Sequence, residues 1–217
     1  MRILVPSTDT WRGFQKLHRY LIMRKHEITL LSSEFIEEFG NVLIYINSTK
    51  YLNEEVRKLI RFYVKRGAKL LVEVVPRSRK DINVLNKLLS GYGAEYTWIK
   101  IYDPLNNNGV PTNPIANPST ILGLTNAKII VEQAYHLRNT VSIPLLMGHE
   151  SALAMNPESN EVIPFPRGTD LVYAVARFSE DQGLQIVCFS GYVFRDTVLQ
   201  GDNIRLLERI LSLLAKS

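Results

Sequence analysis

The stretch that decides the fold is GLQIVCFSGYVFRDTVLQGDNIRLLERILSLLAKS, residues 183–217. Residues 184–190 are almost entirely apolar, which is typical of a strand that is covered on both faces. This strand runs directly into Gly191, and Gly201-Asp202-Asn203 then precede an amphipathic helix at 202–214. A strand, a loop and a capped helix in this order predict the end of an open α/β sheet. Such sheets bind their ligands at the carboxyl ends of their strands.

The first hundred residues extend this pattern, because apolar strands alternate with amphipathic segments. Strands are predicted at 2–6, 27–31, 41–46, 69–75 and 94–101. Helices are predicted at 11–24, 52–67 and 81–89, with a short amphipathic turn or helix at 32–39. The helix at 52–67 has the clearest signals, since Ile60 and Val64 belong to an apolar stripe and Gly67 supplies a helix stop.

The second half of the chain differs, because strands follow one another with few helices between them. Residues 103–120 are dense in Asn and Pro, which predicts a loop or insertion. Strands are predicted at 127–131, 141–147, 171–178 and 184–190, turns at 136–139 and 181–183, and a polar loop at 149–160. We therefore expect one domain over residues 1–217, a three-layer, flavodoxin-like α/β sheet that is mostly parallel with antiparallel strands added late.

Composition limits the classes of function. The chain has 217 residues, a formal net charge of +5 and one cysteine, which excludes a disulfide framework and a cysteine-cluster zinc site. The apolar run at the start is too short for a signal peptide, and no apolar stretch approaches the ~20 residues that span a bilayer. A cytoplasmic protein is therefore expected. The basic residues at 57–69 carry no known nucleic-acid motif, so a solvated face is favoured over a nucleic-acid-binding accessory.

Four stretches resemble a known family, the class I glutamine-amidotransferase-like superfamily. They are YLNEEVRKLIRFYVKRGAKLLVEV (51–74), DINVLNKLLSGYGAEY (81–96), NPSTILGLTNAKIIV (117–131) and GLQIVCFSGYVFRDTVLQGDNIRLLERIL (183–211). The similarity is to the non-catalytic branches, which include the ThuA-like, gliding-motility transporter-associated and intraflagellar-transport-type domains. Catalytic members carry a Cys nucleophile on a tight strand-to-helix turn, but the matching turn here is Pro76-Arg77-Ser78. The resemblance therefore implies a non-catalytic module that binds a protein partner, a second copy or a small polar ligand.

Three residues are candidates for catalysis in the rival hypothesis, a hydrolase or transferase. Glu73 interrupts an apolar strand, where it either faces the crevice as a general base or forms a salt bridge to Arg77 or Arg79. Asp9 follows the first strand and His149 follows the strand at 141–147. The enzyme hypothesis requires Glu73, Asp9 and His149 to converge on one cavity.

Polar residues at the predicted strand ends form the candidate ligand site. They are Ser7, Thr8, Asp9, Asn47, Ser48, Arg195 and Asp196. Helix capping is the alternative role for the first five of them. No cofactor is expected, because neither GxGxxG nor GxxxxGK occurs. No metal site is expected, because the four histidines are scattered. Cys188 lies inside an apolar strand and is expected to be structural.

Overall fold

The computed structural model describes residues 1–32, 39–139, 141–179 and 183–215. The segment predicted at 32–39 and the turn predicted at 181–183 lie largely outside these residues. The helices are α1 (Gln15–Met23), α2 (Glu54–Lys65), α3 (Arg79–Leu89) and α4 (Asp202–Ala215), with short 3-10 helices η1 (Thr8–Trp11), η2 (Thr120–Leu122) and η3 (Gly168–Asp170). None of the helices in the described part of the chain combines the length and the apolar character that a membrane crossing needs.

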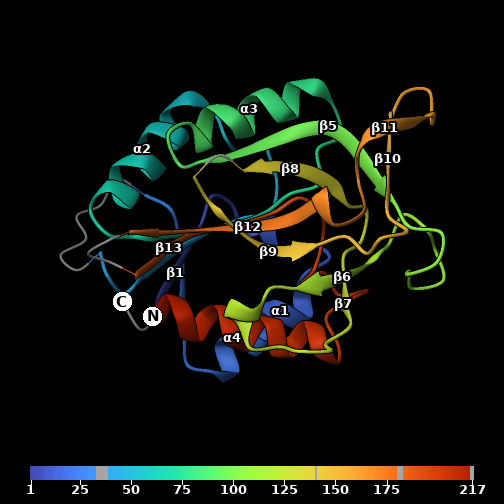
Figure 1. Cartoon of the computed structure of the whole chain (residues 1–217). Helices are drawn as coiled ribbons and strands as arrows, with labels where there is room; N and C mark the ends of the chain where they lie inside the picture. Colours follow the sequence, from blue (N-terminus) through green and yellow to red (C-terminus); the bar gives the residue numbers. More distant parts are fainter. Residues whose placement is uncertain (33–38, 140, 180–182, 216–217) are drawn as a thin grey trace.

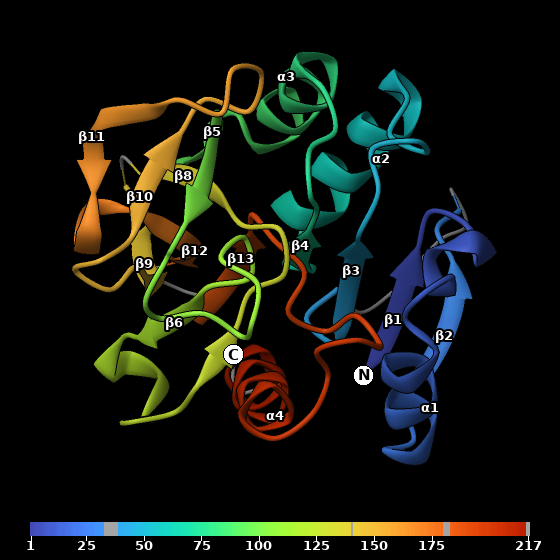
Figure 2. The same cartoon turned by 90° about the vertical axis from the view of Figure 1, so that its right-hand side faces the viewer.

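A nine-stranded mixed sheet runs through the centre of the molecule (Figures 1 and 2). Its strands, in spatial order, are β2 (Glu27–Leu30), β1 (Arg2–Val5), β3 (Val42–Ile46), β4 (Lys69–Glu73), β13 (Gly183–Phe189), β12 (Val172–Ser179), β9 (Ile143–Met147), β6 (Ile115–Pro118) and β7 (Ile129–Ile130). The first five strands pair in parallel, and the pairings from β13 to β7 are antiparallel. The carboxyl ends of β1, β3, β4 and β13 therefore meet at one edge.

A second, antiparallel sheet has four strands. In spatial order they are β11 (Val162–Arg167), β10 (Leu153–Met155), β5 (Ala94–Tyr102) and β8 (Tyr135–Asn139). Figure 1 shows this sheet on the same side of the large sheet as α2 and α3, with α1 and α4 on the other side. The second sheet thus covers the part of the large sheet that α2 and α3 do not reach.

Strands β3 and β4 are buried on both faces, so their successive side chains enter two different cores. On β3, Leu43 and Tyr45 pack in the core beneath α1 and α4, whereas Ile44 and Ile46 pack in the core beneath α2 and α3. This alternation follows from the two-residue period of a strand. It explains why the sequence at 42–46 is apolar throughout. Cys188 on β13 is fully buried in the second core, and burial raises the pKa of its thiol.

The predicted flavodoxin-like, amidotransferase-like three-layer fold is wrong. The large mixed sheet of nine strands and the separate antiparallel sheet replace the mostly parallel sheet covered by helices that such a fold requires. The difference arises in residues 94–179, where strands and 3-10 turns occupy the positions that crossover helices would need. Parallel strands require long crossover connections, whereas antiparallel strands are joined by short turns.

Four strands of the second half were not predicted as strands. β8 lies where a turn was expected, β10 lies in the predicted polar loop, and β11 follows directly after it. β6 lies within residues 103–120, where a loop or insertion was expected, and pairs with β7 and β9. These strands are short, and Pro118, Pro164 and Pro166 interrupt the apolar pattern that signals a strand.

The absence of a side chain at Gly191 allows the end of β13 to lie close to the segment before β8. A Cβ atom at this position would lie 2.5 Å from Cγ1 of Val131 and 3.0 Å from the carbonyl oxygen of Glu132. The backbone of Glu132 also forms two hydrogen bonds with that of Tyr192, of 2.8 and 2.9 Å. Replacement of Gly191 therefore disturbs the segment that carries Tyr192.

Substitution Gly191→Ala is expected to lower the free energy of unfolding by about 1–3 kcal/mol, because an added methyl group overpacks a closed contact. Urea denaturation of the purified variant measures this change. The matched control is Gly40→Ala, since no atom lies within 4 Å of the Cβ position at Gly40. Equal stability of the two variants would show that the close approach at Gly191 does not constrain the fold.

Candidate functional site

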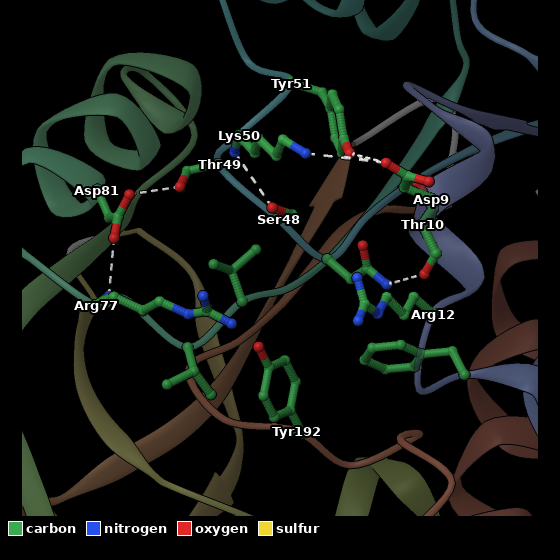
Figure 3. A pocket seen from close by; sticks show the side chains of 14 residues that line it. Asp9, Thr10, Arg12, Ser48, Thr49, Lys50, Tyr51, Arg77, Asp81 and Tyr192 are labelled. Carbon is green, nitrogen blue, oxygen red and sulfur yellow. Dashed lines mark hydrogen bonds and ion pairs between the residues drawn. The ribbon is translucent and has the colours of Figure 1, made fainter.

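A cavity of about 470 Å³ opens at the carboxyl ends of the parallel strands (Figure 3). Its lining comes from the segments that follow β1, β3, β4 and β13, which are neighbours in the sheet. The lining residues are Asp9, Thr10, Arg12, Phe14, Asn47, Ser48, Thr49, Lys50, Tyr51, Val74, Val75, Arg77, Asp81 and Tyr192. The volume falls within the range of small-molecule sites.

One wall of the cavity joins the segments that follow β1 and β3. The hydroxyl group of Tyr51 donates a 2.5 Å hydrogen bond to Oδ2 of Asp9, and Nζ of Lys50 lies 3.9 Å from the same oxygen. Nearer the sheet, Nδ2 of Asn47 donates a 2.6 Å hydrogen bond to the carbonyl oxygen of Thr10. Asp9 is therefore held by groups of the β3 segment.

The opposite wall joins the segments that follow β3 and β4. Oδ1 of Asp81 accepts a 2.5 Å hydrogen bond from Oγ1 of Thr49, and its Oδ2 accepts a 2.8 Å bond from the backbone N–H of Arg77. Ser78 caps α3 by accepting a hydrogen bond from the backbone N–H of Asp81, 3.2 Å away. Both oxygens of the Asp81 carboxylate are thus occupied by donors of the cavity wall.

Two arginines face the cavity without an acidic partner. Figure 3 shows the side chains of Arg12 and Arg77 entering from opposite sides, with the ring of Tyr192 between them. Among the described residues, no carboxylate oxygen forms a salt bridge with either guanidinium group. Burial raises the pKa of the Tyr192 phenol, and the positive charge of Arg77 partly opposes this rise. The cavity therefore carries uncompensated positive charge.

Glu73 directly precedes the lining residue Val74 and is completely buried. Its Oε1 accepts hydrogen bonds of 2.6 Å from the backbone N–H groups of Val193 and Phe194, and its Oε2 accepts a 2.7 Å bond from the hydroxyl of Tyr45. Burial raises the pKa of Glu73 to about 7, although these three donors favour the charged form. The residue fastens the segment after β13 to β4, and it is not among the residues that line the cavity.

Neither role expected for Glu73 is observed. It does not face the crevice, and the salt bridge to Arg77 or Arg79 is not formed. Nε of Arg79 instead lies 3.1 Å from Oε1 of Glu158. The charge of Glu73 is accommodated by hydrogen bonds rather than by a cation.

The structure does not bring the three catalytic candidates together. Asp9 lines the cavity, Glu73 is buried and does not line it, and His149 follows β9, three strands away from β4 in the sheet. The arrangement that the hydrolase or transferase hypothesis requires is therefore not present in these three residues.

Of the seven candidate ligand-binding residues, Asp9, Asn47 and Ser48 line the cavity, and the other four do not. Ser7 caps η1 by accepting a hydrogen bond from the backbone N–H of Asp9, and Thr8 is the exposed first residue of η1. Capping, the alternative role, is thus what the structure shows for Ser7.

Arg195 and Asp196 have structural contacts outside the cavity. Nη1 of Arg195 lies 2.8 Å from Oε1 of Glu132. The carboxylate of Asp196 accepts hydrogen bonds from the backbone N–H groups of Gln15 (3.1 Å) and Lys16 (2.7 Å) at the start of α1. The N-cap residue of α1, Phe14, offers no side-chain cap, so a residue 180 positions away in the chain supplies it.

Substitution Asp196→Ala is expected to lower the free energy of unfolding by about 1–2 kcal/mol, because two backbone N–H groups of α1 lose their acceptor. Chemical denaturation measures the loss. Asp196→Asn keeps one acceptor oxygen and should be the milder of the two changes. If Asp196→Ala is as stable as the wild type, α1 does not depend on this cap.

Several lining residues were missed from the sequence, namely Arg12, Lys50, Arg77, Asp81 and Tyr192. Each of them follows a strand whose carboxyl end lies at the cavity edge, so the rule that selected Asn47 and Ser48 applied to them as well. The signal for Tyr192 was its position directly after the β13 strand and Gly191. No group of three or more His, Cys, Asp or Glu residues suited to a metal ion occurs within the described ranges.

The chain is similar in fold to part of a solved enzyme structure. No protein-family model and no curated protein matches the chain. Among solved structures, the fold is similar to part of alpha-L-fucosidase isoenzyme 2 from Paenibacillus thiaminolyticus, with a TM-score of 0.55 and 14% sequence identity. The match covers 99% of this chain and 32% of the fucosidase chain. At this identity the likeness concerns the fold alone, and the chain spans about a third of the length of that enzyme.

Proposed function

We propose that this chain is a binding domain for a small polar ligand, which it holds in the cavity at the carboxyl ends of β1, β3, β4 and β13. The observation that carries the proposal is the construction of this cavity. Side chains from segments far apart in the sequence line one hollow, and hydrogen bonds between those segments hold its walls in place. A site whose polar groups are fixed before binding loses little conformational entropy when the ligand enters.

A binding role is favoured over catalysis by the placement of the titratable groups. No histidine is among the described residues that line the cavity, and the lining carboxylates Asp9 and Asp81 accept hydrogen bonds from the wall. Glu73, whose pKa of about 7 would suit a general base, is completely buried and already accepts three hydrogen bonds. These features support a pocket that recognises a ligand rather than one that moves protons.

The likeness to part of the fucosidase chain concerns the fold, and a fold alone does not define a function. The fucosidase activity itself is not carried over to this chain. The expected protein partner or homodimer and the expected cytoplasmic location remain predictions.

The proposal is testable through Trp11, which lies between lining residues Thr10 and Arg12 and stacks on Tyr45 at 5.8 Å. The chain has two tryptophans, so Trp98→Phe leaves Trp11 as the sole indole reporter. Titration of this variant with a panel of neutral, anionic and cationic small metabolites should change the Trp11 fluorescence for a subset of them. Because a tyrosine ring at position 48 takes up space at the lining that the ligand would occupy, Ser48→Tyr should weaken that response by at least about 10-fold.

The matched control is Ser159→Tyr, which places the same side chain on an exposed loop outside the cavity. It should bind as the parent protein does. If Ser48→Tyr suppresses none of the fluorescence responses in the panel, the cavity is not a binding site.

A further inference from the structure

We infer that the ligand of this cavity is a phosphomonoester of a small polyhydroxylated compound, an inference that rests on the proposed binding function. The positive charges at the cavity favour an anionic ligand. Arg12 and Arg77 are both exposed and approach one hollow from opposite sides (Figure 3). Two like charges that share a site repel each other unless an anion lies between them. The described part of the chain supplies no carboxylate to either of them.

The two acidic residues of the cavity do not serve as the anion between Arg12 and Arg77. The carboxylate of Asp9 receives the Tyr51 hydroxyl and faces Lys50, and the carboxylate of Asp81 receives Thr49 and the backbone of Arg77. Each acid is therefore neutralised or satisfied within the wall. Within the described residues, neither guanidinium group has a carboxylate partner, so both are open to an external anion.

The geometry favours a phosphate group over a carboxylate. Guanidinium groups bind oxyanions through paired, parallel hydrogen bonds. A carboxylate has two oxygens in one plane and carries one charge, so it can form such a pair of hydrogen bonds with only one guanidinium group. A phosphomonoester presents three oxygens arranged tetrahedrally and a charge of about −1.5 to −2 at neutral pH. It can accept hydrogen bonds from Arg12 and Arg77 on opposite sides and balance both charges.

The remainder of the cavity indicates what is esterified. Phe14, Val74 and Val75 give the lining an apolar part, and Asn47 and Ser48 add polar groups to it. A hollow of about 470 Å³ offers more room than a bare phosphate needs. A lining that combines an apolar part with hydrogen-bonding groups suits a compact carbon skeleton that carries hydroxyl groups.

Isothermal titration calorimetry with four probes tests the inference, namely ribose 5-phosphate, ribose, glycerol 3-phosphate and inorganic phosphate. Ribose 5-phosphate should bind at least about 10-fold more tightly than ribose, because hydrogen bonds between charged groups are the stronger kind. It should also bind more tightly than inorganic phosphate, because the sugar contacts the rest of the lining. Arg12→Gln and Arg77→Gln should each weaken ester binding by roughly 10- to 100-fold.

The matched control is Arg79→Gln, two residues from Arg77, since Arg79 pairs with Glu158 and does not line the cavity. It should bind the ester as the wild type does. Thermal unfolding of all three variants confirms that they are folded, as expected for exposed side chains.

Four results would overturn the inference. They are equal affinity for ribose and its phosphate, equal affinity for inorganic phosphate and the esters, binding that survives both Arg→Gln changes, and no binding of either ester at millimolar concentration. If neutral or cationic metabolites still bind and Ser48→Tyr abolishes their response, the choice of ligand is wrong while the proposed binding function stands. If Ser48→Tyr suppresses no response at all, the binding function itself fails.

Discussion

Substitution Glu73→Ala is expected to lower the free energy of unfolding by roughly 3–5 kcal/mol, the largest effect of any single change considered for this chain. The carboxylate accepts hydrogen bonds from the backbone N–H groups of Val193 and Phe194 and from the hydroxyl of Tyr45. All three donors are buried, so alanine leaves them without an acceptor and without water. The change also creates a cavity next to the carboxyl end of β4.

Urea denaturation at pH 6 measures this loss. Glu73→Gln is the informative control, because its amide oxygen can still accept the two backbone N–H bonds and the hydroxyl of Tyr45 can accept from its amide N–H. Glutamine should therefore retain most of the stability that alanine loses. An alanine variant within 1 kcal/mol of the wild type would mean that Glu73 does not fasten the segment after β13.

The stability contributed by Glu73 is expected to fall by roughly 3 kcal/mol as the pH rises from 4.5 to 7. Burial raises the pKa of this carboxyl group from 4.5 to about 7 in the folded protein. Between these values the folded chain holds a proton that the unfolded chain has released, so the unfolded state binds fewer protons. Its contribution is therefore fully present below pH 4.5 and is lost as the pH rises through 7.

The wild-type curve alone does not isolate this effect, because His136 changes stability in the opposite direction. Burial lowers the pKa of His136 from 6.5 to about 4, and its Nδ1 accepts a hydrogen bond from the backbone N–H of Val172. That contribution is present above pH 6.5 and is lost as the pH falls through 4. The stability of Glu73→Gln, subtracted from that of the wild type at each pH, removes the His136 contribution. A difference that stays constant from pH 4.5 to 7.5 would contradict the raised pKa of Glu73.

The parallel half of the fold was predictable because its signals are local. β3 and β4 are short apolar runs, and α2 carries an N-cap at Asn53, an apolar stripe and a stop at Gly67. The second sheet was not predictable in this way. Strand β11 has exposed residues at both faces and two prolines, and β8 contains His136 and Arg138. Such strands form because partners distant in sequence cover them, which no local pattern reports.

The candidate site likewise contains some residues that local sequence signals reveal and others that they do not. Asp9, Asn47 and Ser48 were found because they follow apolar strands, a local signal combined with a rule about sheets. The roles of Glu73 and Asp196 depend on partners 120 and 180 residues away, so their sequence neighbourhoods do not reveal them. Arg12 and Arg77 become notable only when the structure shows them facing one hollow. Their charge alone does not distinguish them from the other basic residues of the chain.

A crystal structure of the protein grown with ribose 5-phosphate tests whether the cavity at the strand ends binds a small phosphorylated compound. We expect electron density for the ester inside the cavity, with its phosphate group between Arg12 and Arg77 and its sugar toward Asn47 and Ser48. Density for the ester on another surface, with this cavity filled only by solvent, would contradict this expectation.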